Sequence, residues 1–299
     1  MAVLLSICCI TYNHELFIAR AIEGFLIQQT SFEVEIIVGD DSSTDGTLQI
    51  LETYRHQYPQ LIRILASEKN LGPLQNEYNV LSAANGKYIA YCEGDDYWTD
   101  PHKLQKQVDF MELNPEYSVS FHRCRHYDWD RAEWNDDNCG QFFINNTITG
   151  IDITLSMFFN RWITQPLTMV YRRKAIDPDI AMKYRSYRDI HQIYHLLENG
   201  KGYLFAFDGG VRIMHRSGLA SMKDIEYQCN SILGIAGELY RMNRNSFTRK
   251  YYKDILQWSI YEFSAGPKRR QKAFKSTFML FIVQGSLRRL IANTRRIIS

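Results

Sequence analysis

The sequence predicts an α/β fold, with a mostly parallel, doubly wound sheet that has helices on both faces and a helical C-terminal extension. Over the first hundred residues, short apolar runs alternate with segments whose apolar residues recur at helical spacing, as βαβ units require. From about residue 224 onwards, the pattern is helical alone. With 299 residues, of which 45% are hydrophobic and 23% charged, the chain has a globular composition that excludes disordered and low-complexity classes.

The first half of the chain predicts four strands joined by three helices. Residues 3–10 form a continuous apolar run, which is typical of a strand buried on both faces. Further strands are expected at residues 34–38, 61–66 and 88–92. The connecting helices are expected at residues 16–29, 48–54 and 73–85. Pro73 suits a first helical turn, and Asn85-Gly86 is a typical helix stop.

The second half is less regular. The alternation fades after residue 110, and residues 186–199 predict a helix. Short strands are expected at residues 203–207 and 211–214.

Polar segments follow three of the predicted strands, at residues 11–14, 40–45 and 93–96. Ligands of open α/β sheets bind beyond the carboxyl ends of the strands. We therefore expect three loops from distant parts of the sequence to converge on one crevice.

Asp95 and Asp96 directly follow an apolar strand. Hard divalent ions take oxygen ligands, and Mg²⁺ usually combines one or two carboxylates with substrate phosphates. A nucleotide diphosphate could supply those phosphates. The alternative interpretation of the pair is a solvated acidic turn.

Two other strand ends carry candidate ligand contacts. Asp40-Asp41 can accept hydrogen bonds from a base or a ribose, or can cap the following helix. Tyr12 and Asn13 can contact a base, or can form an ordinary turn. Neither a G-x-G-x-x-G segment after the first strand nor a G-x-x-x-x-G-K-[ST] segment occurs, which argues against dinucleotide and P-loop sites.

The cysteines and the apolar runs exclude other classes. The six cysteines lack the spacing of a zinc site or a disulfide scaffold, and we expect them to pack as small hydrophobic residues. The apolar run at residues 3–10 is too short for a membrane span and has no basic residue before it. These observations predict a cytoplasmic or cytoplasm-facing protein.

The ordered motifs resemble a known family. The arrangement strand–TYN–helix–strand–DDSSTDGT–helix–NLG–helix–NGKYI–strand–GDD is similar to that of the large inverting glycosyltransferase family 2, which has the GT-A fold. The resemblance is strong over residues 3–125 and moderate over 160–220. The run from Gly94 to Trp98, followed by Pro101, Lys103, Leu104 and Gln107, looks like the form found in bacterial surface-polysaccharide transferases.

The resemblance implies a nucleotide-diphosphate sugar donor, most typically a UDP-sugar, and a divalent metal cofactor, Mn²⁺ or Mg²⁺. By analogy, Tyr12, Asn13 and Asp41 would contact the base. Asp95 would reach the ribose or the metal, and Asp96 would bind the metal and the diphosphate.

The second half supplies the remaining site residues that the family implies. Asp189 matches the general base that opens a helix, although Arg188 replaces the acidic residue that is common before it. The alternative for Asp189 is an acid favoured by the helix dipole. Arg212 would meet the diphosphate, and His215 is either a metal ligand or a loop histidine. Tryptophans can stack on sugars or fill the core; they are Trp98, Trp129, Trp134 and Trp162.

Charge is distributed unevenly between the predicted regions. We expect a catalytic domain at residues 1–223, made of a nucleotide-sugar-binding half at 1–110 and an acceptor-binding half at 111–223. A helical region follows at 224–299. The net charge of +2 combines −7 over residues 1–265 with nine positive charges and no acid in the tail, residues 266–299.

A basic amphipathic tail suits an anionic membrane surface. We therefore expect a peripheral protein at the inner face of the cell membrane. The alternative is a helix that packs on the catalytic domain and leaves its charges solvated. Nucleic-acid binding is less favoured, because no recognition module accompanies the tail.

Together these features predict transfer of a sugar to a hydroxyl of a glycan, expected to be lipid-linked, in surface-polysaccharide synthesis. One alternative is a non-catalytic nucleotide-sugar-binding protein of the same fold. A nucleotidyltransferase is a weaker alternative, because it would require a Gly-rich, basic phosphate loop after the first strand, and the sequence has none there.

Overall fold

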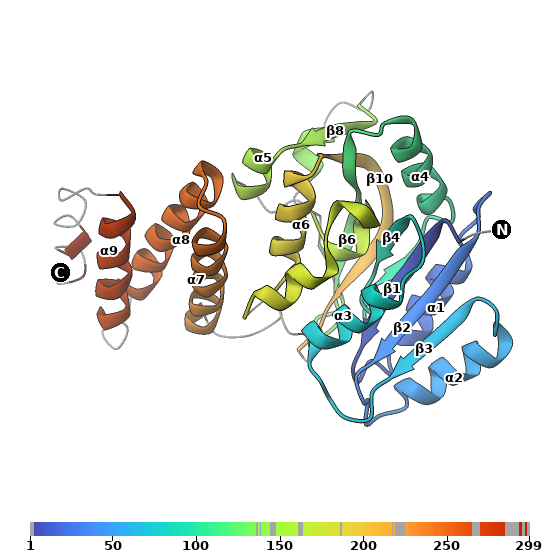
Figure 1. Cartoon of the computed structure of the whole chain (residues 1–299). Helices are drawn as coiled ribbons and strands as arrows, with labels where there is room; N and C mark the ends of the chain where they lie inside the picture. Colours follow the sequence, from blue (N-terminus) through green and yellow to red (C-terminus); the bar gives the residue numbers. More distant parts are fainter. Residues whose placement is uncertain are drawn as a thin grey trace. The chain divides into compact units, whose positions relative to one another are not determined.

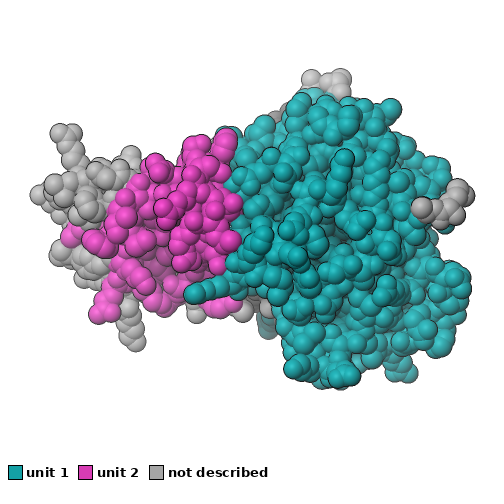
Figure 2. Space-filling view, in the orientation of Figure 1, with its two compact units in different colours: residues 1–216 teal, residues 217–299 magenta. Residues whose placement is uncertain are grey.

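The computed structural model describes most of the chain: residues 3–135, 137, 139–143, 148–160, 164–185, 187–216, 218, 225–264, 270–284, 293–294 and 297. The chain forms two compact units, Met1–Arg216 and Ser217–Ser299 (Figure 2). The predicted boundary between residues 223 and 224 lies outside the described residues.

A twisted sheet forms the centre of unit 1 (Figure 1). Its strand order is β3-β2-β1-β4-β9-β6-β10-β5, with β7 paired to β6 and β8 paired to β10. The strands are β1 (Leu5–Thr11), β2 (Val34–Asp40), β3 (Ile62–Ala66), β4 (Tyr88–Tyr91), β5 (Tyr97–Trp98), β6 (Tyr117–Asp128), β7 (Glu133–Asn135), β8 (Gly150–Ile153), β9 (Val170–Arg172) and β10 (Lys201–Met214). The pairs β1–β2, β2–β3, β1–β4 and β6–β10 are parallel, which confirms the predicted doubly wound half.

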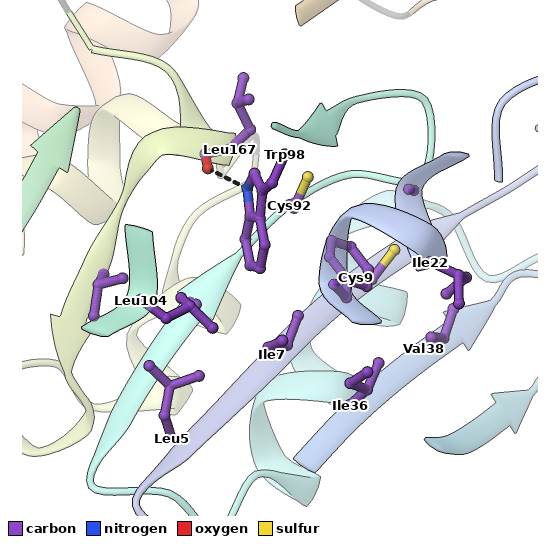
Figure 3. Packing of buried hydrophobic residues seen from close by; sticks show 14 of the residues in the cluster. Leu5, Ile7, Cys9, Ile22, Ile36, Val38, Cys92, Trp98, Leu104 and Leu167 are labelled. Carbon is purple, nitrogen blue, oxygen red and sulfur yellow. Dashed lines mark hydrogen bonds between the residues drawn. The ribbon is translucent and has the colours of Figure 1, made fainter. Parts of the chain in front are cut away.

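Helices cover both faces of this sheet. They are α1 (Ile18–Leu26), α2 (Thr47–Gln57), α3 (Pro73–Ala83), α4 (Lys103–Leu113), α5 (Leu155–Asn160) and α6 (Asp189–Glu198). Apolar residues of α1, α2 and α4 form one core with alternate residues of β1, β2 and β4 (Figure 3). The opposite face carries α3, where a Cβ on Gly39 of β2 would meet Asn76 and Val80.

The second half of the sheet differs from the prediction in one respect. Residues 203–207 and 211–214, predicted as two short strands, belong to the single strand β10. The register of β10 against β6 shifts between Leu204 and Asp208 and again between Asp208 and Gly210. The polar segment that suggests a chain break is therefore an irregularity inside a continuous strand.

Unit 2 is helical, as predicted. It contains α7 (Ile225–Met242), α8 (Ser246–Ser264) and α9 (Arg270–Gln284). Leu256 and Ile260 of α8 pack with Leu280 of α9 in its core. In the part of the chain that the structure describes, no helix has the length and apolarity needed to cross a bilayer.

Candidate active site

The loops after β1 and β2 are joined by hydrogen bonds. The Asn13 amide donates to Ser43 Oγ at 3.0 Å, and the Thr44 amide donates to Asn13 Oδ1 at 2.8 Å. Asn13 adopts a left-handed conformation with φ 55°, which asparagine tolerates better than most residues. The Asn13 side chain therefore holds the two loops together.

The acidic loop after β4 joins the same edge of the sheet. The Gly94 amide donates to the Ile10 carbonyl at 2.9 Å. A Cβ at position 94 would lie 2.9 Å from side-chain atoms of Thr11 and Ile18. Glycine is thus required for the close approach of this loop to β1 and α1. The three predicted loops do converge at one edge of the sheet.

Asp95 lies between two histidines. Its Oδ2 is 3.0 Å from His215 Nε2 and 3.9 Å from His14 Nε2. One ligand atom from each of these three residues lies within 4.8 Å of the others. Burial alone would raise the pKa of Asp95, but the hydrogen bond with His215 and the proximity of His14 outweigh it and hold that pKa below its usual value.

Asp96 faces the end of β10. Its Oδ1 accepts a hydrogen bond from the Ile213 amide at 2.8 Å. Burial, reinforced by the charges of Asp95 and Glu93, raises the pKa of Asp96 well above its usual value. Atoms of these three carboxylates also lie within 4.8 Å of one another.

This arrangement fits a divalent cation. Asp95 Oδ1 and His14 Nδ1 are buried, and neither atom has a hydrogen-bond partner among the described residues. Buried polar atoms are nearly always paired, and crowded carboxylates repel one another unless a cation intervenes. A divalent ion would satisfy the free carboxylate oxygen and offset the negative charge.

A second group of acids continues from this cluster towards α6. Burial and the neighbouring charges of Asp95, Asp189 and Glu77 raise the pKa of Glu93 to about 8. Burial and the charge of Asp189 likewise raise the pKa of Glu77 on α3 to about 8. Arg212 of β10 opposes these effects at Glu93 and at Asp189, and Arg188 opposes them at Glu77 and at Asp189.

Asp189 is the first residue of α6, as predicted, and Arg188 is the N-cap residue. Its Oδ1 accepts a hydrogen bond from the Ile190 amide at 2.9 Å. Burial raises the pKa of Asp189, although that hydrogen bond and the two arginines partly oppose the shift. A carboxylate with a raised pKa is a stronger proton acceptor once it is ionised.

The residues expected to contact a base differ in exposure. Tyr12 follows β1 and is 43% exposed, so its ring is available for stacking. Asp41 is buried, and its two carboxylate oxygens accept hydrogen bonds from the Leu71 and Gly72 amides at 2.7 and 2.8 Å. Asp41 therefore holds the turn that precedes α3. It does not cap α2, the helix that follows β2, whose N-cap residue is Gly46.

The side chains of Trp98, Lys103 and Gln107, which follow the acidic pair in the sequence, are buried. The Trp98 indole Nε1 donates to the Leu167 carbonyl at 2.8 Å (Figure 3). Lys103 Nζ lies 3.6 Å from the centre of the Trp98 ring. Gln107 Nε2 donates to the carbonyls of Ser120 and Thr168. These contacts fix the segment that follows the acidic pair.

The other tryptophans differ from Trp98 in exposure. Trp129 and Trp134 are exposed, and Trp129 contacts the Phe17 ring at 5.0 Å. Trp162 lies outside the described residues.

Three residues of the site were not singled out from the sequence: His14, Glu77 and Glu93. His14 and Glu93 lie within the polar segments that follow β1 and β4, so their position at strand ends was the available signal. Glu77 gave no signal, because one acid in an amphipathic helix looks like a solvated residue.

The chain matches a model of the family described as glycosyl transferase family 2 over residues 6–178. It is 50% identical over 121 residues to an uncharacterised protein of Mycobacterium tuberculosis, covering 40% of this chain and 35% of that protein. It is 36% identical over 111 residues to the Escherichia coli UDP-Glc:alpha-D-GlcNAc-diphosphoundecaprenol beta-1,3-glucosyltransferase WfaP, covering 36% of this chain and 41% of that protein. The chain thus spans well under half the length of these relatives.

Solved structures share the fold. Staphylococcus aureus TarS, residues 1–349 in complex with UDP-GlcNAc, matches with a TM-score of 0.66 and 17% identity, covering 98% of this chain and 90% of that chain. The mannosyltransferase PcManGT of Pyrobaculum calidifontis, in complex with GDP-Man and Mn²⁺, matches with a TM-score of 0.55 and 15% identity, covering 96% and 77%. At this identity the likeness concerns the fold alone, and it confirms the predicted GT-A architecture.

Proposed function

This chain belongs to glycosyl transferase family 2, and from that membership we propose that it is a metal-dependent, inverting enzyme that moves a sugar from a nucleotide-diphosphate donor to a glycan hydroxyl. The expected donor is a UDP-sugar. The observation that carries the proposal lies at the carboxyl edge of the sheet, where Asp95 belongs to one possible metal-binding group with His215 and to a second with Asp96. Asp189 and Arg212 act on the same acidic residues.

Each of these residues has a proposed task in donor binding. Asp95, Asp96 and His215 would hold the divalent metal, which when bound offsets the charge on the leaving diphosphate. Arg212 carries a fixed positive charge next to the same carboxylates and would bind a diphosphate oxygen. Tyr12 is exposed enough to stack on the base. Asn13 and Asp41 keep the base-side loops in place through their hydrogen bonds with Thr44 and the turn before α3.

Asp189 is the proposed general base. An inverting transfer needs a group that removes the proton from the acceptor hydroxyl as its oxygen attacks the anomeric carbon. Among the described residues, one hydrogen bond to the Asp189 carboxylate is seen, from the Ile190 amide, so a lone pair of the carboxylate remains for a substrate proton. Arg212 and Arg188 stabilise its ionised form and keep it ready to accept that proton.

The test compares Asp189→Asn with Asp96→Ala and a matched control, Asp109→Asn, which removes an exposed acid of α4. Release of nucleoside diphosphate from a panel of nucleotide sugars measures turnover, and a metal-dependent thermal shift measures donor binding. We expect Asp189→Asn to keep binding and to lose turnover by about 10²–10⁴-fold. Asp96→Ala should lose both, and Asp109→Asn should lose neither.

Either of two results would overturn the assignment. Wild-type turnover in Asp189→Asn would show that Asp189 is not the general base. Donor binding without any turnover in the wild-type chain, across the panel and with glycan acceptors, would instead favour the non-catalytic binding protein. The anomeric configuration of the product, read by proton NMR, tests inversion directly.

We also propose that the acceptor is lipid-linked and that unit 2 contacts an anionic membrane. The name of the Escherichia coli relative describes such an acceptor for that protein. On α9, Phe278 and Ile282 are 58% and 57% exposed, one turn apart, and Lys275 precedes them on the same helix. Exposed apolar residues beside basic ones suit the headgroup region of a bilayer.

Unit 2 carries further positive charge at its α7–α8 turn. A hollow of about 390 Å³ is lined there by Arg244, Arg249, Lys250, Lys253 and two polar neighbours. Each basic residue near an anionic surface contributes about 1 kcal/mol to binding. The basic tail is thus not the sole source of positive charge that could attract an anionic membrane to this unit. Residues 285–292 of the tail lie outside the described residues.

Vesicle flotation tests this part of the proposal. The double variant Phe278→Gln, Ile282→Gln should lower binding to vesicles that contain anionic phospholipid and leave turnover with a soluble acceptor unchanged. The control is Leu113→Gln, which removes an exposed apolar residue of unit 1. Equal flotation of the double variant and the wild type would refute the role of α9.

A further inference from the structure

His14 lies beside the proposed metal ligands although it belongs to a different loop. Its amide donates to Thr47 Oγ1 at 2.8 Å, which ties it to the start of α2. Its ring is nearly perpendicular to the His215 ring, with centroids 6.1 Å apart and an interplanar angle of 89°. Its Nε2 lies 3.9 Å from Asp95 Oδ2. The chain therefore brings a second imidazole to the same carboxylate.

The His14 ring has no other polar role in the described part of the chain. Its Nδ1 is buried without a hydrogen-bond partner, and its nearest described ring neighbours are Phe17 and His215. A histidine retained for packing alone would satisfy its buried nitrogen, because such atoms are rarely unpaired. The other ring nitrogen, Nε2, lies near the Asp95 carboxylate, and an imidazole in that position suits a shared ion.

The spacing of the three groups agrees with one ion. Bonds of about 2.1 Å from imidazole nitrogen or carboxylate oxygen to a metal place opposite ligands about 4.2 Å apart. Ligand atoms of His14, Asp95 and His215 all lie within 4.8 Å of one another. These separations are close to those that one ion requires.

We propose that His14 is a second imidazole ligand of the active-site metal, and that the pair His14 and His215 makes the site selective for Mn²⁺ over Mg²⁺. Mg²⁺ prefers six oxygen ligands and keeps several waters, whereas imidazole nitrogen favours transition metals. The inference rests on the proposed metal site at Asp95, which it extends to metal identity.

The test measures the bound metal without any nucleotide sugar. Mn²⁺ is titrated into the full chain and followed by the electron paramagnetic resonance signal of the free ion, and Mg²⁺ affinity is obtained by competition. Electron spin echo modulation of the bound Mn²⁺ then counts coupled nitrogens. The variants are His14→Gln and Asp95→Asn, with His56→Gln, an exposed histidine of α2, as the matched control.

We expect two coupled nitrogens in the wild type and in His56→Gln, and one in His14→Gln. Mn²⁺ affinity should fall about tenfold or more in His14→Gln, while Mg²⁺ affinity changes less than about twofold because oxygen ligands dominate its binding. A single coupled nitrogen in the wild type would overturn the inference without any variant, so the test does not depend on how well His14→Gln folds.

The metal-binding measurements separate the role of His14 from the metal site itself. If His14→Gln binds both metals like the wild type while Asp95→Asn binds neither, the role of His14 is wrong and the proposed metal site stands. If Asp95→Asn still binds Mn²⁺ as the wild type does, the proposed metal site itself is wrong.

Discussion

Replacing Lys103 with methionine should stabilise the protein at neutral pH. Lys103 is 0% exposed, and its ammonium nitrogen has no hydrogen-bond partner among the described residues. The face of the Trp98 ring, 3.6 Å away, is its main favourable contact. Burial lowers the pKa of Lys103 from 10.5 to about 7, with weaker opposing effects from Cys92 and Asp100. Methionine retains the length of the side chain and removes the charge.

The size of the expected gain in stability follows from the lowered pKa of Lys103. A fall from 10.5 to about 7 corresponds to about 4–5 kcal/mol against the charged form. The contact with the Trp98 ring offsets about 1–2 kcal/mol of this cost. Since the unfolded lysine binds more protons than the folded one between pH 7 and 10.5, the wild type gains stability as the pH rises through that window. Lys103→Met should therefore be more stable by about 2–3 kcal/mol at pH 7 and by about 1 kcal/mol or less at pH 10.

Urea unfolding followed by far-ultraviolet circular dichroism, at pH 7 and pH 10, measures both differences. Comparing variants cancels the contribution of unit 2 and of every other titrating group. Lys106→Met is the matched control, since Lys106 is exposed and pairs with Asp100, and such pairs are worth about 0–1 kcal/mol. A loss of stability in Lys103→Met at both pH values, or a gain of equal size at both, would refute the reasoning.

Three further predictions concern the same unit. Burial raises the pKa of Glu77 to about 8, so the stability of the wild type falls as the pH rises from about 4.5 through 8. In urea unfolding, Glu77→Gln should therefore gain about 1–3 kcal/mol of stability at pH 8 and little at pH 5. A gain that does not depend on pH would count against this prediction. Asp41→Asn leaves one of the Leu71 and Gly72 amides without its acceptor, so the variant should lose about 2 kcal/mol of stability and bind the donor more weakly, as measured by calorimetry. Unchanged stability and unchanged donor affinity would contradict the role of Asp41. Gly94→Ala brings a Cβ within 2.9 Å of its neighbours, so it should lower the stability of the protein by about 1–3 kcal/mol and lower its Mn²⁺ affinity at least tenfold. A variant with wild-type stability and wild-type Mn²⁺ affinity would show that the close approach does not require glycine.

The first four strands and the helices between them follow from hydrophobic periodicity, because each has one dominant apolar pattern. The strand ends then place Tyr12, Asp41 and Asp95 at one edge of the sheet without further information. The insertion of β9 between β4 and β6 could not be predicted in this way, since a strand of three residues carries no periodicity and its partners are distant in sequence.

The burial of two charged residues, Lys103 and Glu77, also could not be predicted from the sequence. Lys103 and Glu77 lie in helices whose polar residues are normally solvated, so nothing in the sequence marks either residue as buried. The structure places Lys103 against Trp98 and Glu77 near Asp189. His14 required knowledge of which side chains meet across β1 and β10, and that depends on side-chain geometry that the register alone does not give.

The central claim is that the acidic loop after β4 holds a metal-dependent nucleotide-diphosphate site. Calorimetric titration of UDP, with and without Mn²⁺, into the wild type, Asp95→Asn and Asp109→Asn tests it most directly. The account predicts that UDP binds to the wild type and to Asp109→Asn when Mn²⁺ is present, that this binding is weak or lost without the metal, and that Asp95→Asn shows no metal-dependent binding. Equal UDP affinity with and without Mn²⁺, or normal metal-dependent binding by Asp95→Asn, would contradict it.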